Sequence, residues 1–262
     1  MTELTLLTKI YNSHQMKQIP TILADLLGDL DVQSAVKGTL AGRWVQLEVS
    51  GEDEAVATKL LEREIGFCPT TLENVKKFDT LKGYVTGLDK SKEDLFVDIG
   101  VFEPSPINAS VSLIYLQAKL AEAQKTPLKR IAEFWGISNY LPLEIKVLEV
   151  KAEENKILAE LQASQIRKYE LWKESLLDRL IVIGASKQEI ESAVDQEGLS
   201  RDVIDVEAFG MFEHALVCKL GTDAAGLIGR IGRRLRKANF TVFNPKKKLE
   251  PFQAPAQPTK KP

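Results

Sequence analysis

The chain has 262 residues, of which 44% are hydrophobic and 27% are charged, and its formal net charge is −2. This composition is typical of a globular protein of two or three domains and excludes wholesale disorder. Two cysteines and two histidines exclude a disulfide framework and a His-rich metal centre, and no apolar run approaches the roughly 20 residues that cross a bilayer. Since Met1–Tyr11 also lacks a basic segment followed by an apolar one, we expect a cytoplasmic protein with no membrane association, metal or cofactor.

Residues 1–70 predict an α/β unit with the element order βαββα. Apolar residues that alternate or cluster among β-branched ones indicate strands, and apolar residues three and four positions apart indicate helices. Ser13 is the expected N-cap of the first helix, and Gly51-Glu52-Asp53 opens the second. The expected strands are Leu4–Tyr11, Val32–Leu40 and Arg43–Val49, and the first expected helix is Gln15–Leu27.

Residues 78–163 predict a five-stranded barrel. Five short apolar segments alternate with polar turns, and a helical stretch over Ile114–Gly136 falls between the third and the fourth. A helix at this place among five strands is the element order of the OB fold. The expected strands are Leu81–Leu88, Leu95–Ile99, Ile107–Leu113, Leu143–Val150 and Lys156–Leu161.

Residues 165–245 predict a ferredoxin-like unit with the order βαββαβ, which makes the whole chain an α+β protein. Ser186 and Glu189 have the spacing of a capping box at the start of the unit's first helix. Trp172, on a preceding amphipathic helix, is expected to pack between this unit and the barrel. Residues 246–262 predict a disordered basic tail. The expected strands are Arg179–Ile183, Asp202–Ala208, Phe212–Leu220 and Phe240–Phe243.

The central segment resembles the S1-like RNA-binding domains. The resemblance lies in Gly83-Tyr84-Val85, Leu95–Gly100, Ile107–Ser110 and Leu143–Val150, and it covers about a third of the chain. It implies an OB fold in which one aromatic side chain stacks on a base and polar or basic neighbours contact the backbone. The residues that the resemblance assigns to nucleic-acid binding are Phe96, Asn108, Lys156 and, less directly, Phe102 on the loop after Gly100.

The chain departs from the S1 pattern in its charges. Asn108 stands where these domains usually have a histidine, and Glu93, Asp94 and Glu103 surround the expected platform at Phe96. Carboxylates at this place repel phosphate. The alternative is therefore an S1-like barrel that contacts a protein, with Phe96 partly buried.

Positive charge is concentrated at the C-terminal end. From Arg230 onward there are ten basic residues and one acidic residue, whereas residues 1–229 carry a net charge of −11. A helix after Asp223 that packs Leu227 and Ile231 inward would expose its basic side chains to a polyanion. The alternative is a basic tail that only increases the solubility of the protein. The candidate phosphate-binding residues are Arg230, Arg233, Arg234, Arg236, Lys237, Lys246, Lys247 and Lys248.

Two further patterns concern small molecules and catalysis. Gly221–Ile231 resembles the strand-to-helix junction of ACT domains, which bind amino acids there, although Ala225 replaces the usual proline. His214 and Cys218 lie on one face of an expected strand, and we expect both in the core rather than as a nucleophile pair. No acid–base dyad or phosphate-binding loop accompanies them, so we expect no enzyme activity.

The whole chain also resembles an uncharacterised family of archaeal proteins, through Phe96–Val101 and Cys218–Asp223. The expected function is non-catalytic binding of RNA or a ribonucleoprotein, such as the ribosome or RNA polymerase. The alternatives are a protein-interaction adaptor of the translation or transcription machinery and an ACT-like small-molecule sensor.

Overall fold

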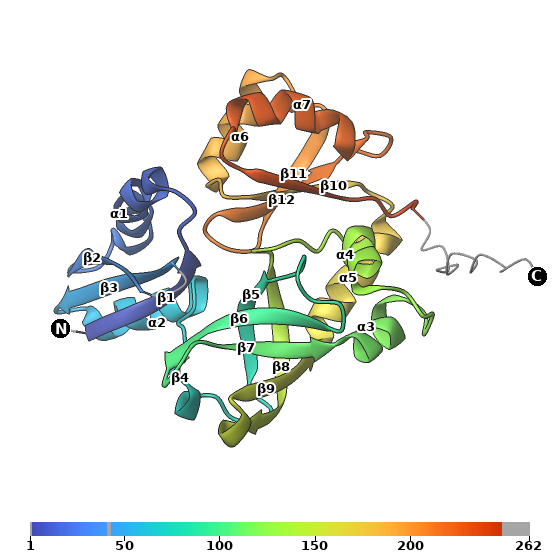
Figure 1. The fold of residues 1–262 in the computed structure, drawn as a ribbon. Coiled ribbons are helices and arrows are strands. Elements are labelled where there is room, and N and C mark those ends of the chain that lie inside the picture. Colours follow the sequence, from blue (N-terminus) through green and yellow to red (C-terminus); the bar gives the residue numbers. More distant parts are fainter. Residues whose placement is uncertain (1, 41–42, 248–262) are drawn as a thin grey trace, which may run out of the picture.

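A computed structural model describes residues 2–40 and 43–247, and they form three units, each built on its own sheet (Figure 1). In the N-terminal unit the central strand β3 pairs antiparallel with both β1 and β2. Val45, Leu47 and Val49 of β3 are buried against the two helices. The unit confirms the expected order βαββα, with β1 (Thr2–Lys9), α1 (Ser13–Leu27), β2 (Val32–Leu40), β3 (Trp44–Gly51) and α2 (Glu54–Glu64).

The N-cap of α1 is Asn12, so the prediction of Ser13 was wrong. The Asn12 side-chain oxygen accepts the backbone N–H groups of His14 and Gln15. The Gln15 side chain accepts the backbone N–H of Asn12 in return, which completes a capping box one residue earlier than expected.

The central unit is a closed five-stranded barrel. Its strands are hydrogen-bonded in the order β6-β5-β8-β9-β7, and a β6–β7 pairing closes the ring. β7 and β9 run parallel, and the other neighbours are antiparallel. Two short helices lie between β7 and β8, where one helical stretch over Ile114–Gly136 was expected. The strands are β5 (Thr80–Thr86), β6 (Asp94–Glu103), β7 (Ile107–Ser112), β8 (Pro142–Lys151) and β9 (Lys156–Leu161), with α3 (Leu113–Leu120) and α4 (Leu128–Trp135).

Short elements flank the barrel. A two-residue strand, β4 (Thr70–Thr71), pairs parallel with β6 and is followed by the 3₁₀ turn η2 (Leu72–Asn74). A second 3₁₀ turn, η3 (Ala152–Glu154), joins β8 to β9. The helix α5 (Ala163–Ser175) then leads to the last unit.

The C-terminal unit is a four-stranded antiparallel sheet with the strand order β11-β12-β10-β13. The expected element order βαββαβ is confirmed, and so is the capping box of Ser186 and Glu189. Its elements are β10 (Arg179–Ile183), α6 (Lys187–Gln196), β11 (Val203–Ala208), β12 (Glu213–Cys218), α7 (Ala224–Arg234) and β13 (Asn239–Phe243).

Strand β10 is buried on both faces, which explains its unbroken apolar sequence. Leu180 and Val182 pack against α6 and α7, whereas Ile181 and Ile183 point the other way and join the core of the barrel unit. The C-terminal sheet therefore carries its helices on one face and docks on the barrel unit with the other (Figure 1).

Aromatic rings fill the contact between the barrel unit and the C-terminal sheet. The ring centroids of Trp135 and Phe243 lie 5.9 Å apart in a stacked arrangement, and those of Trp172 and Phe243 lie 5.3 Å apart. Trp172 is buried between the units, as predicted. Ring pairs of this kind add about 0.5–1.5 kcal/mol each beyond the area that they bury.

A buried ion pair joins the N-terminal unit to the barrel. Lys9 Nζ on β1 lies 2.6 Å from Asp98 Oδ2 on β6 and sits 4.5 Å from the centre of the Trp44 ring. Trp44, on the face of β3 that points away from its own helices, makes an edge-on contact with Tyr84 of β5 at 5.3 Å. The charge of Lys9 is thus enclosed by a carboxylate and two aromatic rings.

The three units meet at the carboxyl group of Glu213, which is fully buried on β12. The Tyr11 hydroxyl of the N-terminal unit donates to Glu213 Oε1 at 2.5 Å, and the Tyr84 hydroxyl of the barrel lies 3.3 Å from Oε2. Burial raises the pKa of Glu213 to about 7, although the two hydroxyls and the nearby cation of Lys82 lower it. Each unit supplies one group to this junction.

Replacing Lys9 with Ala is expected to lower the free energy of unfolding by about 3–5 kcal/mol, because it leaves the Asp98 carboxylate without its cation inside the protein. Urea denaturation followed by circular dichroism measures the change. The matched control is Arg63→Ala, which removes an exposed ion pair with Glu64 and should cost no more than about 1 kcal/mol. Equal losses in the two variants would contradict a special contribution from the buried pair.

Glu213 is expected to make the folded protein less stable as pH rises from about 4.5 to about 7. Across this interval the unfolded chain has lost the Glu213 proton while the folded protein still holds it, so raising the pH favours unfolding. The Glu213→Gln variant has no titrating group at this position. Between pH 4.5 and pH 7 its free energy of unfolding should therefore rise by about 3 kcal/mol relative to that of the wild type. Urea midpoints of both proteins, measured from pH 4 to 8, test this, and a constant difference would refute it.

Candidate nucleic-acid interface

The outer face of the barrel brings together three of the four residues that the S1 resemblance singled out. Alternation along β6 buries Leu95 and Val97 and turns Phe96 outward, opposite Ser110 of β7. Asn108 on β7 and Lys156 on β9 are exposed, and each immediately precedes a residue of the parallel pair Ala109–Ile157. Phe96, Asn108 and Lys156 therefore share one surface, on which Phe96 is half-buried.

Phe102 does not join this surface. It lies near the end of β6 and packs against the buried cluster of Leu7, Trp44, Cys68 and Tyr84, where the N-terminal unit meets the barrel. The docked N-terminal unit thus limits how much of this ring is open to a base.

Acidic groups also lie on the barrel face. Asp94 shares the outward side of β6 with Phe96, and its Oδ2 accepts a hydrogen bond of 2.8 Å from Ser110 Oγ. Asp98 lies on the same side of the strand, but Lys9 neutralises it. Around the half-buried Phe96 ring, the face offers the Asn108 amide, the Lys156 cation and the Asp94 carboxylate, which forms no ion pair within residues 2–40 and 43–247. This combination suits contact with a base better than contact with phosphate.

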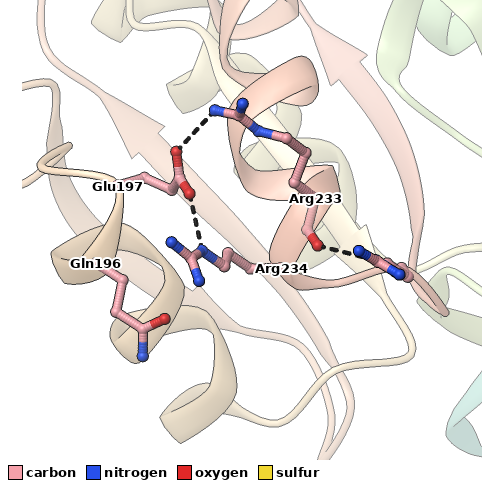
Figure 2. Close-up of a pocket in the computed structure, with 5 residues that line it drawn as sticks. Gln196, Glu197, Arg233 and Arg234 are labelled. Atoms are coloured by element: carbon pink, nitrogen blue, oxygen red, sulfur yellow. Dashed lines mark hydrogen bonds and ion pairs between the residues drawn. The ribbon is translucent and has the colours of Figure 1, made fainter.

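The basic side chains of α7 form a more organised group. Leu227 and Ile231 are buried beneath the helix, as expected, and Arg230, Arg233 and Arg234 project outward. They converge on Glu197 at the end of α6: Arg234 Nε lies 2.8 Å and an Arg233 amino group 3.1 Å from its carboxylate oxygens (Figure 2). Arg230 donates to the Glu197 backbone carbonyl, and its Nε lies 4.0 Å from a carboxylate oxygen. We call these four residues the arginine cluster.

The hydrogen bond from Arg234 and the charge of Arg233 hold the pKa of Glu197 below its ordinary value. Three cations and one carboxylate leave the arginine cluster with a net charge of +2. Beside it, Gln196, Glu197, Arg233, Arg234 and Arg236 line a hollow of about 450 Å³ (Figure 2). Guanidinium groups oriented in this way can bind a further anion through paired N–H groups.

Sequence reasoning missed Glu197. A signal was present, because a carboxylate in the last turn of a helix is unfavourable next to the negative end of the helix dipole. Such a residue is best retained where cations from elsewhere compensate it, as the three arginines do here.

The remaining predicted cations extend the basic surface. Arg236, Lys237, Lys246 and Lys247 are exposed, and Arg236 Nε donates to the Arg233 carbonyl at 3.3 Å. Lys248 and the expected tail beyond it lie outside the described residues. Since α7 covers the face of the C-terminal sheet that points away from the barrel, the basic surface and the barrel face are separate (Figure 1).

The start of α7 offers little to an amino-acid ligand. The backbone N–H groups of Ala224 and Ala225 are taken by the side chains of Asp178 and Asp223, and that of Gly226 by the Asp223 carbonyl. Two carboxylates at this helix end also repel an anionic ligand. These contacts weigh against the ACT-like sensor.

His214 and Cys218 are both buried, as predicted. Burial lowers the pKa of His214 to about 4 and raises the pKa of Cys218 to about 11, so both groups are neutral near pH 7. Within residues 2–40 and 43–247 no three His, Cys, Asp or Glu side chains gather as metal ligands would. In the same ranges no helix has the length and apolar character needed to cross a membrane.

Solved structures give only distant likenesses to this chain. An uncharacterized protein from Methanocaldococcus jannaschii, MJ1198, matches at 12% identity over 34% of this chain and 95% of its own, with a TM-score of 0.23. A complex of a/eIF2alpha, aDim2p and rRNA from Pyrococcus horikoshii matches at 13% identity over 49% of this chain and 70% of its own, with a TM-score of 0.24. At such low TM-scores these likenesses identify neither fold nor function.

Family models match almost the whole chain, although no curated protein does. The DUF2110 N-terminal domain matches residues 3–70, the DUF2110 central domain residues 75–173, and the DUF2110 C-terminal domain residues 177–243. The expected kinship with an uncharacterised family is thereby confirmed. Since the three parts follow one another in order, the chain belongs to the three-part DUF2110 family.

Proposed function

We propose that this protein binds RNA or a ribonucleoprotein without catalysing a reaction, and that the basic surface of α7 supplies most of the affinity. The observation that carries the proposal is the arginine cluster, in which Glu197 binds Arg233 and Arg234 through its carboxylate and Arg230 through its backbone carbonyl, beside further exposed cations. Guanidinium groups bind phosphate bidentately, and the arginine cluster keeps a net charge of +2 that favours a polyanion.

The finer fold assignments belong to the same proposal. We infer that the barrel is an S1-like OB fold, supported by its closure, by the parallel β7–β9 pair and by the helices between β7 and β8. The C-terminal strand order β11-β12-β10-β13, antiparallel throughout, supports a ferredoxin-like unit.

The two surfaces would contribute differently. Phosphate contacts at α7 do not depend on base sequence, and they weaken as the salt concentration rises. For a single strand, each phosphate contact makes the slope of log K against log salt concentration steeper by about 0.7. The barrel face would add a base contact at Phe96, smaller than the usual 1–3 kcal/mol of stacking because the ring is half-buried. An RNA partner would therefore be held mainly by its backbone.

The double substitution Arg233→Gln and Arg236→Gln is expected to weaken binding of a fluorescent single-stranded RNA. Because two phosphate contacts are lost, the slope of log K against log salt concentration should become shallower by about 1.4. Fluorescence anisotropy over a series of salt concentrations measures both quantities. The matched control is Arg63→Gln, an exposed arginine on α2 of the N-terminal unit, which should leave both unchanged. Because Arg63→Gln removes one charge and the test variant removes two, a control effect half as large as the test effect would show that only overall charge matters.

Glu197→Gln tests the arginine cluster by removing its acidic residue and keeping its three arginines. Removing the carboxylate raises the net charge of the cluster from +2 to +3 and frees its guanidinium groups for phosphate. We expect tighter RNA binding and a slope steeper by up to about 0.7. Unchanged or weaker binding, with an unchanged circular dichroism spectrum, would remove the cluster from the interface.

One observation favours a protein partner instead, namely the uncompensated Asp94 carboxylate beside Phe96. An adaptor that docked through this face would bind its partner without help from the arginine cluster. Absence of RNA binding by the wild-type protein even at low salt would favour this second function. Affinity purification with wild type and Asp94→Asn would then test it.

A further inference from the structure

Phe78 is the one exposed aromatic residue in the part of the chain that the structure describes. It lies in the connection between the N-terminal unit and β5, and 60% of its surface is open to solvent. Exposure of a single apolar side chain is ordinary in itself. What distinguishes Phe78 is how its backbone is held and what surrounds its ring.

The backbone of Phe78 is fixed in a conformation that suits a phenylalanine poorly. Its φ angle is +75°, in the left-handed region where a bulky side chain is a genuine outlier. The Lys76 N–H donates to the Asp79 side chain at 2.7 Å, and the Phe78 N–H donates to the Val147 carbonyl at 2.8 Å. The Val147 N–H donates back to the Asp79 carbonyl at 2.9 Å.

These bonds clamp the turn of residues 76–79 onto β8 and hold the ring out in solvent. Strained backbone persists only where its surroundings over-determine it, and such sites cluster where ligands bind. An asparagine or a glycine would adopt this backbone more easily.

Two lysines approach the ring, Lys77 from the preceding position in the chain and Lys146 from β8. Lys77 Nζ lies 5.0 Å and Lys146 Nζ 5.5 Å from its centre, and Lys76 is exposed beside them. Over the described residues neither Lys77 nor Lys146 is in an ion pair. The nearest acid in the turn, Asp79, is already engaged by the Lys76 backbone. The ring therefore faces two lysine ammonium groups that form no ion pair among the described residues.

We propose that Phe78 is a stacking platform for a base of single-stranded RNA, and that Lys77 and Lys146 bind the adjoining phosphates. A nucleotide offers both required parts close together, a flat ring that stacks on Phe78 and a phosphate that binds the lysines. The inference rests on the proposed RNA binding but concerns a different surface from the one that the S1 resemblance indicates.

The two surfaces lie at opposite ends of β5. Thr86 pairs with Phe96, whereas Thr80, two residues after Phe78, pairs with Lys146. The six residue steps between Thr80 and Thr86 span about 20 Å of strand. Effects of substitutions at Phe78 and at Phe96 can therefore be separated.

The experiment measures binding of a fluorescein-labelled oligouridylate by anisotropy. Phe78→Asn removes the ring but suits the left-handed backbone, so we expect about 5- to 150-fold weaker binding with an unchanged or higher melting temperature. Phe78→Trp keeps a stacking face and should retain the affinity. Because Trp44, Trp135 and Trp172 are buried, emission from the new exposed tryptophan can be followed separately and should be quenched by the RNA. Val56→Ala, which is 53% exposed on α2, is the matched control.

The outcomes separate this inference from the proposed function. RNA binding by wild type that Phe78→Asn leaves unchanged would overturn the stacking platform alone. Absence of wild-type binding at low salt would overturn the proposed function together with the platform. Poly-L-glutamate is added as a competitor. If it displaced the RNA equally well from wild type and from Phe78→Asn, the surface would be assigned to an acidic protein and the base-stacking proposal would fail.

Discussion

The arrangement of the three units depends on the buried carboxyl group of Glu213. A carboxyl group enclosed in protein must be hydrogen-bonded, and its partners here, Tyr11 and Tyr84, come from the other two units. Hydrogen bonds are directional, so this contact fixes orientation, whereas the aromatic rings around Phe243 supply buried area. The Lys9–Asp98 pair adds a second directional contact between the N-terminal unit and the barrel.

This arrangement decides which surfaces remain for a partner. The C-terminal sheet uses the side of β10 that carries Ile181 and Ile183 to dock on the barrel unit, so its helices, and with them the basic residues of α7, face away. The N-terminal unit docks beside Phe102 and leaves the strands around Phe96 and Asn108 open. The candidate surfaces are therefore separate patches and not one continuous groove.

Local pattern predicted most of the fold because the determining interactions are local. Val32–Leu40, Lys156–Leu161 and Arg179–Ile183 are strands with the expected bounds, since the sequence of each segment shows either period-two alternation or an unbroken apolar run. The cap of α1 could not be decided this way, because Asn12 and Ser13 are both good caps and the reach of Gln15 chooses between them. The junction was beyond prediction, since Tyr84 and Glu213 are 129 residues apart.

The candidate site shows the same division. The excess of basic residues in the sequence indicated the basic surface of α7. It did not indicate that Arg230, Arg233 and Arg234 all contact Glu197. Resemblance located Phe96, whereas Phe78 is the first residue of the predicted barrel unit and precedes its first expected strand, where no periodicity marks it. Two or more separated cationic patches also have a consequence for affinity. A strand long enough to reach both α7 and the barrel gains from the effective concentration of the second contact once the first has formed, which a short oligonucleotide cannot do. Under the proposed function, the affinity should therefore depend more on the length of the RNA than on its base sequence.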